Sequence, residues 1–207
     1  MIRANSILGV VLRSIRRPPE ASECNPMVLK AVITDSSEAI SLDAAVLDRL
    51  QWEQFEHDEK YHREIARLTV QDRLKHMALH FAKYAGEIYA GPSEDKFRRL
   101  VTDTLIIGIS AANALNIRLA DVVGQTDAGN AFEFDRELVV AAGRMATACE
   151  KLDHLEDFPF RPHIAGEVIK IIDAALSVFM DKGWDVPATI KERLAPVKAK
   201  SIFYGKL

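Results

Sequence analysis

The chain has 207 residues, of which 48% are hydrophobic and 28% are charged, which allows a sizeable core and excludes an intrinsically disordered chain. The 30 acidic and 27 basic residues give a formal net charge of -3, which excludes a strongly basic nucleic-acid-binding surface over the whole chain. Two distant cysteines, Cys24 and Cys149, exclude a disulfide scaffold and predict a cytoplasmic protein, and no apolar run approaches the roughly 20 residues that span a bilayer.

Residues 1–40 differ in pattern from the rest and are predicted to form an N-terminal extension. Two β-leaning runs, 6–15 and 27–34, flank the proline-marked connector RRPPEASECNP, so we expect a short β-ribbon that packs on the body of the protein. The first 17 residues are also rich in arginine and contain no acid, a composition typical of a targeting segment. Both interpretations stay open at this point.

From residue 41 onward the hydrophobic spacing becomes helical, and residues 41–207 are predicted to form one all-α domain, an antiparallel bundle of about five to six helices. Ser41, Thr69 and Ser93 are suitable N-caps, while Gly91 and Gly183 are suitable helix stops. The predicted helices are 41–68, 69–90, 93–116, 133–157, 163–182 and 187–200. The two halves share a coarse plan, which indicates either a duplication or the repetition that antiparallel bundles commonly show.

The helix predicted over residues 97–116 is apolar almost all round, so it should be central. Its carboxylate, Asp103, needs compensation, because burying an unpaired charge is costly. Asp103 falls near one line of the helix surface with Arg99, Ser110 and Asn113. The compensation is therefore an ion pair with Arg99 one turn earlier, a hydrogen bond to a neighbouring helix, or a bound metal or substrate.

The preceding helix carries a second polar line, formed by His76, His80, Lys83 and Glu87. A tight turn joins the two helices, so antiparallel packing should bring Glu87 toward Asp103. Carboxylates on facing helices are suited to Mg²⁺, a hard cation that prefers oxygen ligands. The alternative is a solvated flank of the bundle.

The His57-Asp58 pair does not fit a metal-dependent phosphohydrolase of the His–Asp type, because the required upstream histidine is missing. His57, Asp58, Glu59 and His62 are instead predicted to lie in an exposed, charged helix end. The sequence also lacks a phosphate-binding loop, a nucleophile elbow and a zinc-protease motif.

The segment HFAKYAGEIYAG, followed by LVTDTLIIGISAANALNI, resembles the core of the MazG-like all-α nucleoside triphosphate pyrophosphohydrolases. Members of that family hold Mg²⁺ with an ExxE and an ExxD pair and cleave between the α- and β-phosphates. The resemblance covers residues 80–117 and implies that Glu87 and Asp103 hold the metal. Tyr84 and Leu100 stand where the other two glutamates are expected.

The missing carboxylates raise the question of what replaces them. Glu150 and Asp153 lie three residues apart on the fourth predicted helix. If the second half folds back on the first, they are candidate metal ligands; otherwise they form an exposed acidic face.

Two classes of function follow from the resemblance. The first is a Mg²⁺-dependent enzyme that cleaves a nucleoside triphosphate, with His80 and Lys83 meeting phosphate and Asn113 or Asn116 contacting sugar or base. The second is a catalytically inactive helical module for binding or assembly. Family analogy and the apolar helices also favour a homodimer.

Overall fold

The computed structural model of the protein describes residues 42–124, 134–200 and 202. Regular structure in this part of the chain is helical throughout, without a β-strand. In chain order the elements are α1 (Ala44–Tyr61), α2 (Arg63–Ala66), α3 (Val70–Tyr89), α4 (Glu94–Ala114), the 3-10 turn η1 (Leu119–Asp121), α5 (Phe134–Asp153), α6 (Phe160–Asp181) and α7 (Val186–Lys200). The predicted all-α helical bundle is confirmed, whereas the predicted ribbon within residues 1–40 lies outside the described residues.

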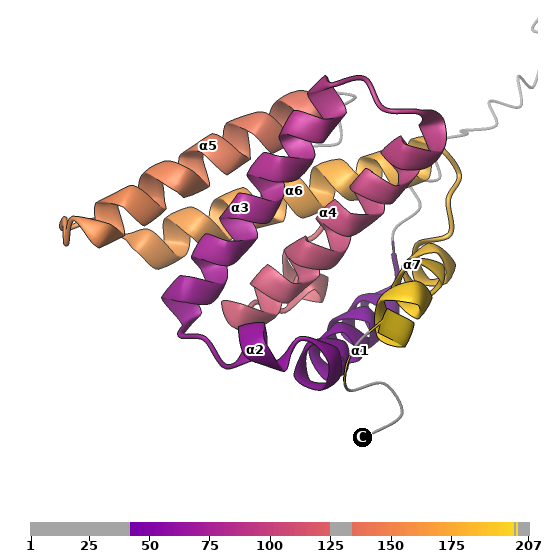
Figure 1. The fold of residues 1–207 in the computed structure, drawn as a ribbon, viewed down its shortest axis with the longest axis horizontal. Helices are drawn as coiled ribbons and strands as arrows, with labels where there is room; N and C mark the ends of the chain where they lie inside the picture. Colours follow the sequence, from indigo (N-terminus) through magenta and orange to yellow (C-terminus); the bar gives the residue numbers. More distant parts are fainter. Residues whose placement is uncertain (1–41, 125–133, 201, 203–207) are drawn as a thin grey trace, which may run out of the picture. The chain divides into compact units, whose positions relative to one another are not determined.

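The four longest helices, α3 to α6, enclose the core (Figure 1). Helix α3 packs against α4 and α5, and α6 packs against the same two helices. Helices α1 and α7 both pack against α4 as well. Because α4 is covered by α1, α3, α6 and α7, its sequence is apolar on nearly every side.

Helices α4 and α6 approach each other closely at Gly108. A Cβ atom added there would lie 2.7 Å from Cγ1 of Ile172. Ile172 is fully buried, so its side chain has little room to move aside. The missing side chain of Gly108 is therefore what allows this helix contact.

The predicted helix signals at residues 69, 93 and 183 are confirmed. The Thr69 hydroxyl accepts a hydrogen bond from the Asp72 backbone N–H at 3.2 Å, and the Ser93 hydroxyl accepts one from the Lys96 N–H at 3.4 Å. Gly183 follows α6 with a φ of 63°, the left-handed conformation that ends many helices. These signals are local in the chain, which is why the sequence reveals them.

The prediction of one helix over residues 41–68 is wrong, because the chain breaks at His62 into α1 and α2. The N-cap of α1 is Asp43, whose carboxylate accepts a hydrogen bond from the Ala45 N–H at 3.2 Å. Helix α2 has no buried residue. Ile65 and Ala66 of α2 are nevertheless half-buried, whereas Arg67 and Leu68 after it are exposed.

The core bundle consists of two helical hairpins, α3–α4 and α5–α6, packed against each other. This arrangement agrees with the shared plan of the two halves, and a duplication as its origin stays a prediction. None of the described helices combines the length and the apolar character that crossing a bilayer requires.

Candidate functional site

Polar side chains on α3 form a hydrogen-bonded line that faces α1 and α4. The Nε2 atoms of His76 and His80 lie 3.1 Å apart, and Nδ1 of His80 lies 3.0 Å from the Tyr84 hydroxyl. The Lys83 ammonium is 3.5 Å from the same Nδ1 atom. His80 and Lys83, both predicted to meet phosphate, therefore stand together, and both ring nitrogens of His80 are engaged within the protein.

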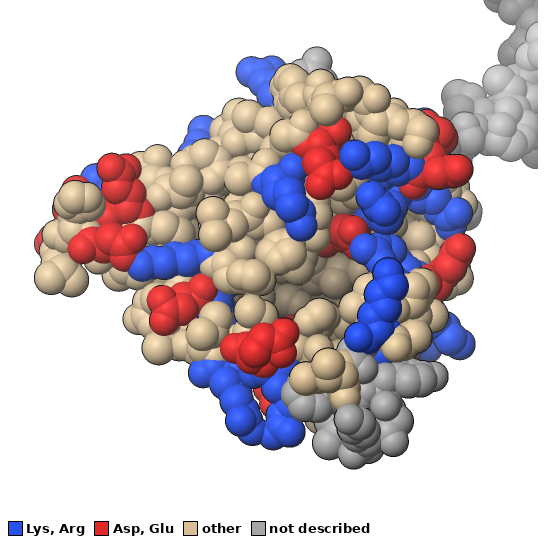
Figure 2. All heavy atoms as spheres, viewed as in Figure 1, with Lys and Arg blue, Asp and Glu red and all other residues tan. Residues whose placement is uncertain are grey.

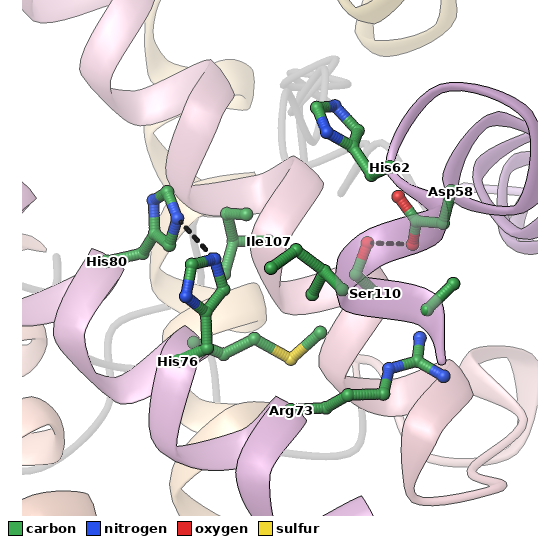
Figure 3. Close-up of a pocket in the computed structure, with 10 residues that line it drawn as sticks. Asp58, His62, Arg73, His76, His80, Ile107 and Ser110 are labelled. Carbon is green, nitrogen blue, oxygen red and sulfur yellow. Dashed lines mark hydrogen bonds between the residues drawn. The ribbon is translucent and has the colours of Figure 1, made fainter. Parts of the chain in front are cut away.

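Beside this line lies a small cavity of about 100 Å³, which we call the Asp58 cavity (Figure 3). Helices α1 to α4 all contribute to its wall. Its polar lining residues are Asp58, His62, Arg73, His76, His80 and Ser110. Its apolar lining residues are Ile65, Ala66, Met77 and Ile107. Small-molecule pockets usually occupy about 300–1,000 Å³, so this cavity accommodates only one end of a ligand.

The carboxylate of Asp58 is held in place from two sides. Its Oδ2 accepts a hydrogen bond from the Ser110 hydroxyl at 2.6 Å (Figure 3), and its Oδ1 accepts one from the Gln54 amide at 2.8 Å. Burial raises the pKa of Asp58, although both hydrogen bonds and the positive charges of His62 and Arg73 oppose the rise. A carboxyl group with a raised pKa beside a cavity is a frequent feature of functional sites.

The prediction that His57, Asp58, Glu59 and His62 are exposed is wrong for three of these four residues. His57 is buried, and Asp58 and His62 are half-buried against neighbouring helices. The reason is the packing of α1 on α4, which turns one face of this charged segment inward. Of the four residues, only Glu59 is exposed as predicted.

His80 is a neutral base at physiological pH. Burial lowers its pKa to about 4, and the charges of Lys83, His76 and His62 lower it further. Burial also raises the pKa of Tyr84, so its phenol stays protonated at neutral pH. His80 and Tyr84 are therefore uncharged members of the hydrogen-bonded line on α3. His76 and His80 line the cavity, and Tyr84 does not.

Asp103, the predicted metal ligand in the central helix, is paired with an arginine from another helix. Arg193 of α7 places Nε 2.7 Å from Oδ1 of Asp103 and donates a hydrogen bond from Nη2 to Oδ2 at 3.0 Å. The alternative partner proposed from sequence, Arg99, does not form this pair. Glu87 is likewise paired, with its carboxylate 3.0 Å from the Lys96 ammonium.

The structure does not bring the four predicted metal ligands together. Asp153 of α5 pairs with Lys75 near the start of α3, whereas Glu87 lies three turns further along α3, roughly 18 Å away at 1.5 Å per residue. Glu150 is exposed on α5. Among the described residues, no group of three or more His, Cys, Asp or Glu side chains is placed to hold a metal ion. A metal role for these carboxylates stays a prediction.

The two asparagines predicted to contact sugar or base have structural roles. Asn113 exchanges two hydrogen bonds with Gln51 of α1, from Nδ2 to the Gln51 carbonyl and from the Gln51 amide to Oδ1, both at 2.9 Å. Asn116 adopts a φ of 55° directly after α4, and the Ile117 N–H reaches back to the Ala112 carbonyl at 2.9 Å. This is a helix-ending motif for which asparagine is second only to glycine.

The sequence did not identify four polar residues of the cavity wall as part of a functional site: Asp58, His62, Arg73 and Ser110. A buried hydroxyl such as that of Ser110 needs an acceptor, but in the same helix Thr102 and Thr104 donate to carbonyls of α4 itself, so the signal is weak. Nothing local identifies Asp58 as that acceptor.

A comparison with known protein families found no family model that matches the chain, and comparisons with curated proteins and with solved structures found no significant match. The resemblance of residues 80–117 to the MazG-like proteins therefore stays a prediction.

Proposed function

We propose that this protein binds a nucleotide, or a related small ring compound that carries phosphate, in the Asp58 cavity, without hydrolysing it. The observation that carries the proposal is a hydrogen-bonded carboxylate, Asp58, set beside apolar walls in a cavity of about 100 Å³. The Asp58 cavity, at about 100 Å³, is smaller than the apolar cavity of about 150 Å³ that accepts benzene, so it would hold only one edge of a ring. The rest of the ligand would project from the opening.

The chemistry of the wall fits a heterocyclic ring. Met77 and Ile107 offer apolar contact to its faces, while Asp58 accepts hydrogen bonds from ring N–H groups. Arg73 in the wall and Lys83 beside His80 supply positive charge for a phosphate group. Figure 2 shows Lys and Arg side chains mixed with Asp and Glu side chains over the face that is viewed as in Figure 1.

Calorimetric titration with AMP, adenosine and inorganic phosphate tests this proposal. We expect AMP to bind, and adenosine and phosphate each to bind at least about tenfold more weakly, because each lacks half of the recognised chemistry. Asp58→Asn should weaken AMP binding by about tenfold, and Ala66→Phe should abolish it by filling the cavity. The matched control is Glu59→Gln, the same chemical change at an exposed neighbour outside the cavity. Equal affinities of Asp58→Asn and Glu59→Gln would refute the proposed site.

A Mg²⁺-dependent nucleoside triphosphate pyrophosphohydrolase is the second candidate. The observation in its favour is that Asp103 and Glu87 both act on Tyr84, since the negative charge of each raises the pKa of that phenol. Two of the four predicted ligands therefore lie at the same end of the α3–α4 pair. Against it, each of these carboxylates already has a cationic partner.

Pyrophosphate release from nucleoside triphosphates with Mg²⁺ separates the two candidates. Asp103→Asn removes the proposed ligand, and Arg193→Gln removes only its partner, so the two variants break the same ion pair. Release by the wild type and by Arg193→Gln, but not by Asp103→Asn, would favour the hydrolase. No release by the wild type favours the binding module.

The predicted homodimer and cytoplasmic location belong to the same proposal. Large apolar side chains are exposed on α3 and α5, among them Leu79 (71%), Tyr89 (64%) and Val139 (40%). Such side chains are typical of contact surfaces when they form one patch. Light scattering of the full chain gives the mass, and a monomer at all concentrations would contradict the dimer.

A further inference from the structure

A second and larger pocket, which we call the His57 pocket, lies between α1, α4 and α7 and has a volume of about 330 Å³. It shares no lining residue with the Asp58 cavity. Its apolar wall consists of side chains that are buried in the fold: Leu50, Ile109, Ile190 and Leu194. This volume falls at the lower end of the range for pockets that hold small molecules.

The wall of this pocket contains buried polar atoms without hydrogen-bond partners. His57 is only 3% exposed, and among the described residues neither of its ring nitrogens has a partner. Gln54, 4% exposed, uses its amide nitrogen for Asp58, and its Oε1 has no partner in the same part of the chain. Buried polar groups in folded proteins are nearly always satisfied, so these two unpartnered side chains make the pocket a candidate site for a ligand with hydrogen-bonding groups.

The hydrogen-bonding capacity of the wall can be stated atom by atom. Burial lowers the pKa of His57 to about 4, and the nearby charges of His62 and Lys198 contribute to the shift. The ring is therefore neutral at pH 7 and offers one N–H donor and one acceptor nitrogen. Together with Oε1 of Gln54, the wall presents two acceptors and one donor, so it favours a ligand with an O–H or N–H group.

The charged lining of the pocket favours a ligand with a negative charge. Lys60, Lys191 and Lys198 line it, the last two from α7. Two glutamates line it as well, but one of them, Glu53, lies 3.8 Å from the guanidinium of Arg49. The lysines therefore leave an excess of positive charge next to the apolar wall.

We propose that the His57 pocket binds a small aromatic or branched aliphatic carboxylate that also carries a hydroxyl or amino group. The carboxylate contacts Lys191 and Lys198, the apolar body packs on the leucine and isoleucine side chains, and the hydroxyl or amino group donates to His57 or Gln54. The proposal does not rest on the nucleotide proposed for the Asp58 cavity, although Gln54 connects the two sites through its hydrogen bond to Asp58.

The probe for this proposal is 4-hydroxybenzoate, titrated calorimetrically into the full chain at pH 7. Two matched probes each lack one recognised feature: benzoate has no hydroxyl group, and 4-hydroxybenzyl alcohol has no carboxylate. We expect saturable binding of 4-hydroxybenzoate and about tenfold weaker binding of each of the other two. No saturable binding of 4-hydroxybenzoate, or equal affinity for all three probes, overturns the proposal.

Variants locate the binding within the pocket. His57→Phe keeps a ring but removes both nitrogens, and should weaken the binding of 4-hydroxybenzoate by about tenfold. Lys191→Ala changes an exposed side chain, leaves folding intact and should weaken binding by about fivefold. Lys200→Ala removes an exposed lysine of the same helix outside the pocket and serves as the control. An affinity of Lys191→Ala equal to that of Lys200→Ala overturns the proposal, whether or not His57→Phe folds.

One further titration keeps the two sites apart. Lys191→Ala should bind AMP as the wild type does, because Lys191 does not line the Asp58 cavity. A loss of AMP binding in this variant would contradict the independence of the two sites.

Discussion

Arg193 of α7 holds Asp103 of α4 through two contacts, at 2.7 Å and 3.0 Å. The Asp103 side chain is 15% exposed and that of Arg193 is 29% exposed, so the pair is largely shielded from solvent. The carboxylate in the central helix is thus compensated by the protein itself. The Asp103–Arg193 pair therefore joins α7 to α4.

Breaking this pair should destabilise the fold. Asp103→Asn leaves the guanidinium of Arg193 without its counter-charge, and we expect a loss of about 1–3 kcal/mol in the free energy of unfolding. Urea denaturation followed by circular dichroism measures it. Glu87→Gln, at the more exposed pair with Lys96, should change stability little. Equal effects of the two substitutions would contradict the structural role of the Asp103–Arg193 pair.

Gly108→Ala should also destabilise the protein, because the new Cβ would lie 2.7 Å from Ile172. We expect a loss of about 1–3 kcal/mol from overpacking, reduced by the better helix propensity of alanine. Gly143→Ala is the matched control, since nothing lies within 4 Å of its added Cβ. That variant should gain about 0.5–1 kcal/mol. A stabilised Gly108→Ala would show that α4 and α6 do not meet as described.

Ser110→Ala removes the hydroxyl that donates a hydrogen bond to the ionised carboxylate of Asp58. With the 2.6 Å hydrogen bond lost, the pKa of Asp58 should rise further, and stability at pH 7 should fall by about 1–2 kcal/mol. As the pH falls and Asp58 becomes protonated in the variant, the difference from the wild type should shrink. Denaturation midpoints between pH 4 and pH 8 test this, and a difference that stays constant with pH would contradict it.

His57 should make the protein sensitive to mild acid. Its pKa is about 4 in the folded protein and near 6.5 when unfolded, so the unfolded chain binds a proton first as the pH falls. Stability that is fully present above pH 6.5 is therefore lost progressively down to pH 4, by up to about 3 kcal/mol for this group. His57→Phe should remove this loss and should be neutral or stabilising at pH 7, because it also removes two unsatisfied buried atoms. Parallel acid titrations of both proteins would refute this prediction.

The positions of the helices could be predicted because their signals are local. Thr69, Ser93 and Gly183 act on the turn next to them, and the apolar pattern around Asp103 identified the central helix. The break at His62 was missed, because no glycine or proline marks it. The separation of α2 from α1 is visible only in the folded structure.

The candidate site could be predicted only in part, because its partners are distant in the chain. Ser110 and Asp58 are 52 residues apart, and Asp103 and Arg193 are 90 residues apart. Local spacing singled out His76 and His80, which do meet. The charged residues next to Asp58 in the sequence suggested that it is exposed. The packing of α1 on α4 instead turns it inward.

The central claim is that the Asp58 cavity holds a ligand, and NMR titration of the isotope-labelled protein with AMP tests it most directly. We predict that AMP shifts the imidazole signals of His76 and His80 and the amide signal of Ser110, and leaves the ring of His163 on α6 unchanged. Shifts confined to residues outside the cavity, or no shifts at all, would contradict the claim.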